Sequence, residues 1–181
     1  MSSYSIKVPP ESRKSIREAA AFTRLVLEKK HGDDSLYLPI IEMLEFTLPK
    51  LDEEFNFEVL PKSKMGSNHG LTNTAEKTII LREDVYERAL EGFGRDRMTA
   101  AHELGHYVLH SNIDITFARA DEDLKPYENS EWQANCFGGE ILVPYAKREL
   151  LIGKTTQEIA DLCGVSLEAA DYQRKFLRLG N

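Results

Sequence analysis

The chain has 181 residues and a net charge of −7, with 41% hydrophobic and 29% charged residues. This composition fits a soluble globular protein with one core and at most a small helical appendage. We expect no membrane span, because no apolar stretch is long enough, and no direct nucleic-acid partner, because phosphate binding needs clustered Lys and Arg.

Cysteine usage and the N-terminus indicate the compartment. Cys136 and Cys163 have no C-x-x-C spacing and are expected to be reduced, buried thiols. The N-terminus lacks the apolar segment of a signal peptide. We therefore expect a cytoplasmic protein.

Helical patterns open the chain. After Pro9 and Pro10, apolar residues recur at helical spacing until Gly32, where the helix is expected to stop. Pro39 is expected to open a second helix and Pro49 to close it.

Strand patterns follow. Phe55, Phe57 and Val59 alternate with polar residues, as in a half-buried strand. Residues 70–73 and 78–81 read as two more short strands with a turn between them. A small sheet of about three strands, antiparallel or mixed, is therefore predicted.

The next predicted helix, residues 96–110, carries the pattern H-E-x-x-H at His102, Glu103 and His106. Positions i and i+4 share a helix face, so both imidazoles can reach one metal ion while Glu103 handles a proton. The alternative is a solvent-facing helix with two chance histidines. An apolar stripe on the same helix argues against it.

A catalytic zinc site uses three protein ligands and leaves one position for water. The longer pattern with a third downstream His is excluded, because Asn112 occupies that position. A later helix is predicted to begin at Ser130, with Gln133 completing a capping box. Glu131 in its first turn is the expected third ligand.

Two other glutamates compete with Glu131. Glu128 precedes the predicted helix start, and Glu140 lies about half a turn round the helix and faces away. Taken alone, Glu131 would be read as a carboxylate that the helix dipole favours.

Residues 111–129 are polar, acidic and aperiodic, and we interpret them as an active-site border or lid, the alternative being a linker without a role. Residues 155–179 are predicted to form two short helices broken at Gly164, with Ser166 as a cap. This region is similar to a helix-turn-helix, but Glu168 and Asp171 offset its basic residues, which favours packing or partner docking over DNA binding.

Two motifs taken together resemble the ImmA/IrrE family of metallopeptidases over roughly residues 10–176. The first is the H-E-x-x-H pattern followed by His110. The second comprises Glu131-x-x-Ala134-Asn135-x-Phe137 and the following Ile141-Leu142-Val143-Pro144. Gly138-Gly139 and Val143 depart from the family pattern without touching a proposed ligand.

The resemblance implies a gluzincin-type site. His102, His106 and Glu131 would hold one Zn²⁺ per chain, and Glu103 would be the catalytic base. It also implies a role: members of this kind typically cleave a helix-turn-helix repressor of a mobile element, prophage or stress-response system.

Five further residues are candidates to orient a ligand or to stabilise the transition state. His110, the third histidine of the stripe, and Asn135, on the helix of Glu131, suit the first role. The donor to the oxyanion is left open among Tyr107, Tyr145 and His69.

The predicted fold is therefore α+β and zincin-like: mostly helical, with the small sheet beside the H-E-x-x-H helix. We expect a metallopeptidase domain over residues 1–145 and a helix-turn-helix-like segment over 146–181 packed on it. The predicted function is a zinc-dependent endopeptidase acting on a protein substrate, such as a repressor. The alternative is a non-proteolytic regulator that binds a protein partner or DNA on the same fold.

Overall fold

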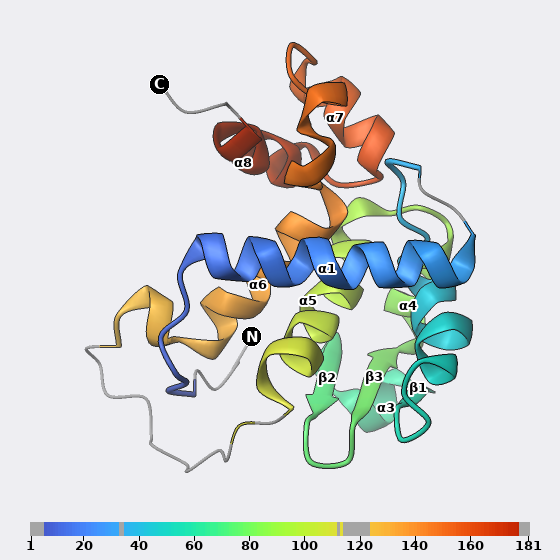
Figure 1. Ribbon diagram of the computed structural model, residues 1–181. Helices are drawn as coiled ribbons and strands as arrows, with labels where there is room; N and C mark the ends of the chain where they lie inside the picture. Colours follow the sequence, from blue (N-terminus) through green and yellow to red (C-terminus); the bar gives the residue numbers. More distant parts are fainter. Residues whose placement is uncertain (1–5, 33–34, 112, 114–123, 178–181) are drawn as a thin grey trace.

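The computed structural model describes residues 6–32, 35–111, 113 and 124–177. Over these residues the fold is α+β and mostly helical with a small sheet, as predicted (Figure 1). The sheet is mixed and has the strand order β1-β3-β2, with β1 parallel and β2 antiparallel to the central β3. Both β1 and β2 are therefore edge strands.

The strands are β1 (Asn56–Leu60), β2 (Gly70–Asn73) and β3 (Thr78–Arg82). The α-helices are α1 (Arg13–His31), α2 (Ile40–Glu42), α3 (Lys62–Met65), α4 (Glu83–Leu90), α5 (Gly94–His110), α6 (Ser130–Leu142), α7 (Thr156–Cys163) and α8 (Leu167–Leu177). Tighter or wider turns are η1 (Met43–Thr47, a π-helix) and the 3-10 segments η2 (Leu48–Lys50), η3 (Pro126–Glu128) and η4 (Tyr145–Leu150).

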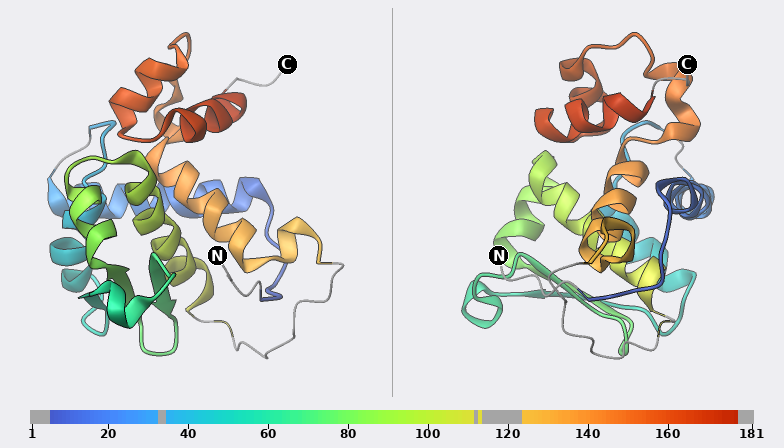
Figure 2. Two further views of the ribbon diagram at one scale, coloured as in Figure 1. Left: turned by 180° about the vertical axis from the view of Figure 1, so that it is seen from behind. Right: turned by 90° about the vertical axis from the view of Figure 1, so that its left-hand side faces the viewer.

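Helix α5 is the centre of the molecule. It packs against β2 and β3 on one side and against α6 on the other, and α6 in turn packs against α1. Figure 2 shows the sheet at one end of the molecule and α7 and α8 at the opposite end. Ile79 and Leu81 of β3, Leu104 of α5 and Phe137 of α6 are completely buried and form the middle of the core.

Small residues let α5 and α6 approach closely. A Cβ on Gly105 would lie 3.0 Å from the carbonyl oxygen of Ala134, and one on Gly138 would lie 3.2 Å from the backbone nitrogen of His102. These separations are at the lower limit of real contacts. The two helices therefore cross at a distance that only short side chains allow.

A buried arginine joins α5 to the C-terminal helices. Arg97 is 1% exposed and donates hydrogen bonds to the carbonyl oxygens of Gly164 (2.7 Å) and Leu38 (2.8 Å). Its guanidinium also lies 3.8 Å from the centre of the Tyr37 ring. Because the last carbonyls of a helix have no partner within it, Arg97 satisfies a group at the end of α7 that would otherwise be buried unpaired.

The division of the chain into domains at residue 145 stays a prediction.

Several helix boundaries are as predicted. Helix α1 ends at Gly32, whose φ of 88° is left-handed, and α7 ends at Gly164 with a φ of 63°. Helix α8 follows Ser166, whose hydroxyl accepts a hydrogen bond from the Ala169 nitrogen. The turn predicted between β2 and β3 is also confirmed.

Three details differ from the prediction. Pro49 does not end the second helix: the chain passes through the π-helix η1, and Pro49 lies in the first turn of η2, where its missing N–H costs nothing. The cap of α6 is Asn129, which accepts from the Glu131 and Trp132 nitrogens, while Ser130 accepts from the Ile6 nitrogen.

The third difference is in β1, where Val59 is exposed because this edge strand is only thinly covered. Helices α3 and α4 were not predicted. The proposed border or lid at 111–129 falls mostly outside the described residues. Among the helices of the described segments, none has the length and apolar character needed to cross a membrane.

Gly164→Ala is expected to cost more stability than Gly153→Ala. Both glycines have a positive φ, so alanine is strained at either site by about 1 kcal/mol. At Gly164 the new Cβ would also overlap the Tyr37 ring and approach Arg97, whereas at Gly153 nothing lies within 4 Å. Urea unfolding should give a loss of about 2–4 kcal/mol for Gly164→Ala against about 1 kcal/mol for the control. Equal losses would mean that α7 is not held tightly at its end.

Candidate metal centre

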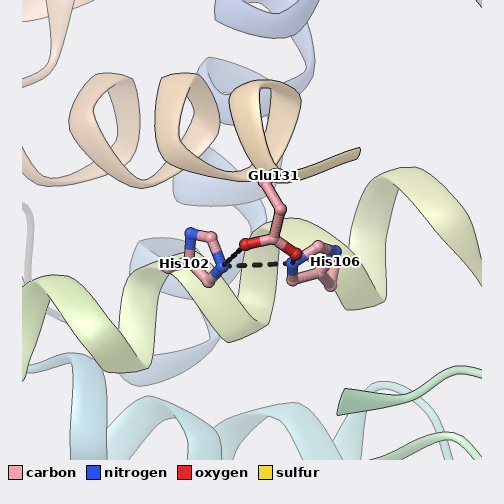
Figure 3. A group of neighbouring side chains, drawn as sticks. All are labelled: His102, His106 and Glu131. Atoms are coloured by element: carbon pink, nitrogen blue, oxygen red, sulfur yellow. Dashed lines mark hydrogen bonds and ion pairs between the residues drawn. The ribbon is translucent and has the colours of Figure 1, made fainter. Parts of the chain in front are cut away.

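Three side chains from two helices converge at the crossing of α5 and α6 (Figure 3). The Nε2 atoms of His102 and His106 lie 3.1 Å apart. Oxygens of the Glu131 carboxylate lie 3.3 Å from Nε2 of His102 and 3.2 Å from Nε2 of His106. The i, i+4 spacing places both imidazoles on one face of α5, and the first turn of α6 brings the carboxylate over them.

These separations fit a metal ion. Ligand atoms of a tetrahedral zinc lie about 2.0–2.1 Å from the metal, which puts them roughly 3.3 Å from one another. The three side chains are each 15–23% exposed, so the cluster is accessible from one side. Three protein ligands with an open side are typical of a catalytic metal site, whereas a structural site is closed by four.

Local structure explains why Glu131, and no neighbouring acid, joins the histidines. Asn129 caps α6 and fixes the first helical turn, in which Glu131 lies. Glu128 precedes the helix in η3. Glu140 lies on another side of α6, where it is buried and accepts hydrogen bonds from Arg13 (2.9 Å) and Arg17 (3.0 Å).

The cluster is electrostatically coupled. Burial alone would raise the pKa of Glu131, but hydrogen bonds and charge interactions with His102 and His106 outweigh it and lower that pKa. Burial alone would lower the pKa of His102. The hydrogen bond with Glu131 and the charge of Glu103 outweigh burial, so the pKa of His102 is raised. Glu131 therefore stays ionised and places a negative charge beside the two imidazoles, where a cation is attracted.

Glu103 lies beside the cluster but points toward the sheet. Its carboxylate is buried, and the hydroxyl of Thr72 on β2 lies 2.7 Å from its Oε2. A Cβ on Gly70 would lie 2.7 Å from the Glu103 side chain, so the glycine provides the space that the carboxylate fills. Burial raises the pKa of Glu103, although His102, Thr72 and His106 act against it. A carboxylate with a raised pKa beside a metal site suits proton transfer.

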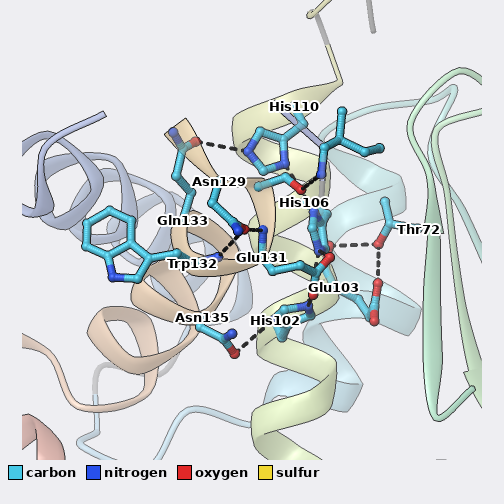
Figure 4. Close-up of polar contacts among 12 residues, drawn as sticks. Thr72, His102, Glu103, His106, His110, Asn129, Glu131, Trp132, Gln133 and Asn135 are labelled. Atoms are coloured by element: carbon cyan, nitrogen blue, oxygen red, sulfur yellow. Dashed lines mark hydrogen bonds and ion pairs between the residues drawn. The ribbon is translucent and has the colours of Figure 1, made fainter. Parts of the chain in front are cut away.

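Each imidazole has a partner on its other nitrogen (Figure 4). Asn135 Oδ1 lies 3.0 Å from Nδ1 of His102. Nδ1 of His106 lies 3.1 Å from Nδ1 of His110, and Nε2 of His110 lies 3.0 Å from Oε1 of Gln133. Burial lowers the pKa of His110 to about 4.

A cleft of about 550 Å³ opens beside the cluster. It is lined by His102, Glu103 and Glu131 together with His69, and its far wall is built from α8 and includes Tyr172. Burial, followed by the charges of Arg82 and Arg95, lowers the pKa of His69.

The structure does not bring the two candidate tyrosines to the cluster. The Tyr107 hydroxyl donates to Asp52 at 2.5 Å, on the side of α5 that faces away from the cleft lining. The Tyr145 ring lies against the guanidinium groups of Arg17 and Arg148, at 3.8 and 4.6 Å. Of the three predicted oxyanion donors, only His69 lines the cleft.

Three residues of the site were not predicted from the sequence. Thr72 and Gly70 were expected in a strand without a contact to Glu103, and Gln133 was expected in a capping box. A threonine and a glycine on a strand just before an H-E-x-x-H helix are a weak signal. Gln133 lies two residues after Glu131, and this spacing turns the two side chains to different sides of a helix, so the sequence gives no signal for its contact with His110.

Comparisons with known proteins extend these observations. The model of the peptidase family described as the IrrE N-terminal-like domain matches residues 53–175, more than half of the chain. Among solved structures, the chain is similar to a Mycobacterium tuberculosis transcriptional regulator, with a TM-score of 0.50 and 14% sequence identity. That match covers 90% of this chain and 52% of the regulator, so the chain spans about half of that protein's length and the likeness concerns the fold alone. A comparison with curated proteins found no match.

Glu131→Ala is expected to abolish stable metal binding. Removing an outer partner of a ligand already lowers metal affinity about 10–100-fold, so loss of a ligand itself should exceed 100-fold. The measurement is metal content by elemental analysis after equilibration with zinc and dialysis. Glu128→Ala is the matched control, because it removes a nearby glutamate that lies outside the cluster. Equal metal content in the two variants would contradict the three-ligand site.

Proposed function

The chain belongs to the peptidase family described as the IrrE N-terminal-like domain, and on that premise we propose that it is a zinc-dependent endopeptidase acting on a specific protein. One observation carries the proposal. Two imidazoles and a carboxylate converge within 4.8 Å of one another, and the buried carboxylate of Glu103 lies beside them in the same cleft.

Zinc is the proposed metal because His102, His106 and Glu131 form the His₂Glu ligand set of zinc peptidases, and their spacing fits it. When bound, zinc would act as a Lewis acid on the scissile carbonyl and make the attacking water more acidic. The protein's own contribution is to hold the three ligand atoms in place before the metal arrives.

Glu103 is the proposed general base and acid. It accepts a proton from the attacking water and delivers it to the leaving amine as the peptide bond breaks. Two features support this role: burial raises the pKa of Glu103, and the Thr72 hydroxyl lies 2.7 Å from one of its two carboxylate oxygens. His69 is the proposed donor to the oxyanion, since it lines the same cleft.

The substrate is proposed to bind as an extended strand along β2. This strand is at the edge of the sheet, and its first residue, Gly70, lines the cleft beside Glu103. Backbone hydrogen bonds along an edge strand hold a peptide without demanding a sequence, so selection falls to the cleft walls. A helix-turn-helix repressor is the proposed substrate, and this choice rests on the family resemblance.

Glu103→Gln is expected to lose proteolysis and keep its metal. General acid–base catalysis contributes about 10²–10⁴-fold, and the amide cannot accept the proton. Zinc-loaded protein is incubated with helix-turn-helix repressors from the source genome, and intact masses are recorded. The wild type should yield two fragments whose masses sum to the repressor plus one water, while the variant leaves the repressor whole.

Metal content is the control for this comparison, and it should match between the two proteins. Cleavage by Glu103→Gln at the wild-type rate would exclude Glu103 as the base. If both proteins inactivate the repressor without cutting it, the protein is instead a regulator that acts by binding.

Gly70→Ala is expected to slow cleavage at least tenfold with zinc content unchanged. The new Cβ would force the Glu103 side chain to move, and displacement of a catalytic group by about 1 Å can cost 10²-fold. Leu90→Ala is the control, because Leu90 is exposed on α4, away from the cleft and from β2. Equal rates for the two variants would show that Glu103 does not depend on the space at Gly70.

A further inference from the structure

A chain of hydrogen bonds leads from His106 away from the metal cluster into the protein interior. It passes through His110 on α5 and Gln133 on α6 and ends at two backbone carbonyls. We propose that His110 and Gln133 are positioning residues that keep the proton of His106 on Nδ1 and leave the Nε2 lone pair for the metal. This inference rests on the metal site proposed above.

The orientation of the Gln133 amide is the first step. Its Nε2 lies 2.8 Å from the carbonyl oxygen of Pro9 and 2.8 Å from that of Tyr127. Backbone carbonyls only accept hydrogen bonds, so the NH₂ end of the amide must face them. The two contacts use both amide protons, and Oε1 is therefore fixed as an acceptor facing His110.

The protonation of His110 follows. Gln133 Oε1 can only accept, so Nε2 of His110 must carry a proton to form the 3.0 Å contact. The imidazole is 2% exposed, and within the described part of the chain its ring nitrogens contact only Gln133 and His106, neither of them a carboxylate. A buried ring without an anionic partner is neutral, so Nδ1 of His110 is an acceptor.

His106 then has one arrangement. Its Nδ1 lies 3.1 Å from the acceptor Nδ1 of His110 and must donate a proton to it. Nε2 is therefore the ring nitrogen left for the metal, and this atom is the one that lies 3.2 Å from Glu131 and 3.1 Å from His102. The direction of each hydrogen bond is fixed because the series ends at two backbone carbonyls, which can only accept.

His102 is held differently. Its Nδ1 has one partner, Asn135, whose side chain is exposed on α6. Water can replace an exposed amide, and among the described contacts no second partner fixes which end of the Asn135 amide faces the ring. The geometry therefore fixes the Nδ1 proton of His106 and leaves the tautomer of His102 less firmly fixed.

The test is nitrogen-15 NMR of the histidine rings at pH 7. In metal-free wild-type protein, two-bond correlations should show His110 neutral with its proton on Nε2, and His106 with a proton on Nδ1. In zinc-loaded protein, the His106 Nδ1 proton should persist. A His110 ring with its proton on Nδ1 would overturn the proposal. Because the metal-free spectrum carries the result, failure of the protein to bind zinc would count against the metal site alone.

Two variants separate positioning from packing. His110→Leu removes the acceptor, and zinc affinity measured by chelator competition should fall about 10–100-fold, the range typical of outer partners. His110→Asn places an amide oxygen near the Nδ1 position and should restore most of the affinity and the Nδ1 proton on His106.

Ser111→Ala is the control, since it alters the adjacent residue, whose hydroxyl contacts only the Tyr107 carbonyl among the described residues. Thermal melting establishes that each variant is folded. Equal zinc affinity in folded His110→Leu and wild type would overturn the proposal. If His110→Leu does not fold, the wild-type spectra decide alone.

Discussion

A Cβ on Gly105 of α5 would lie 3.0 Å from the carbonyl oxygen of Ala134 on α6, so the two helices are already in tight contact at this point. The site depends on this contact. The ligands come from two helices, and a carboxylate in the first turn of α6 reaches the imidazoles of α5 only if the helix axes approach closely. Larger residues at the crossing would push the two helices apart and move Glu131 away from the imidazoles. Gly138, which departs from the pattern of the family that the chain resembles, serves the same close packing.

Helix α5 has two kinds of neighbour, and the polar groups of the site divide accordingly. Toward the cleft lie His102 and its exposed partner Asn135, where water can enter. Toward the interior lie His106 and its buried partners, where each donor needs a matched acceptor because an unpaired polar group costs about 1–3 kcal/mol. Glu103 is on a third side, against the sheet. The same helix thus turns one histidine of the cluster toward an exposed partner and backs the other with buried ones.

Much of this arrangement could be predicted from the sequence. The i, i+4 histidines, the helix breaks at Gly32 and Gly164 and the three short strands follow from local rules of periodicity and backbone conformation. Glu131 could be singled out because the predicted start of its helix was close to the observed one. The capping residue is Asn129, however, and the Ser130 hydroxyl accepts a hydrogen bond from the N-terminal segment.

What could not be predicted depends on contacts between distant segments. Thr72 approaches Glu103 only because β2 packs against α5, and no local pattern encodes that contact. Tyr107 was a reasonable candidate by its position next to His106, but Asp52, far away in the sequence, binds its hydroxyl. Gln133 faces His110 only once the helices have crossed. Such residues have ordinary sequence neighbours, and their roles exist only in three dimensions.

The series of hydrogen bonds that starts at His106 ends at the backbone carbonyls of Pro9 and Tyr127 and does not involve the side chains of these two residues. Evolutionary drift at both positions is therefore compatible with an unchanged His106 environment, provided the backbone path is kept. His110 and Gln133 are bound to each other instead, so a change in one calls for a change in the other. Among relatives, the dependence would be visible as covariation between these two positions, while the carbonyls on which it rests would leave no trace in an alignment.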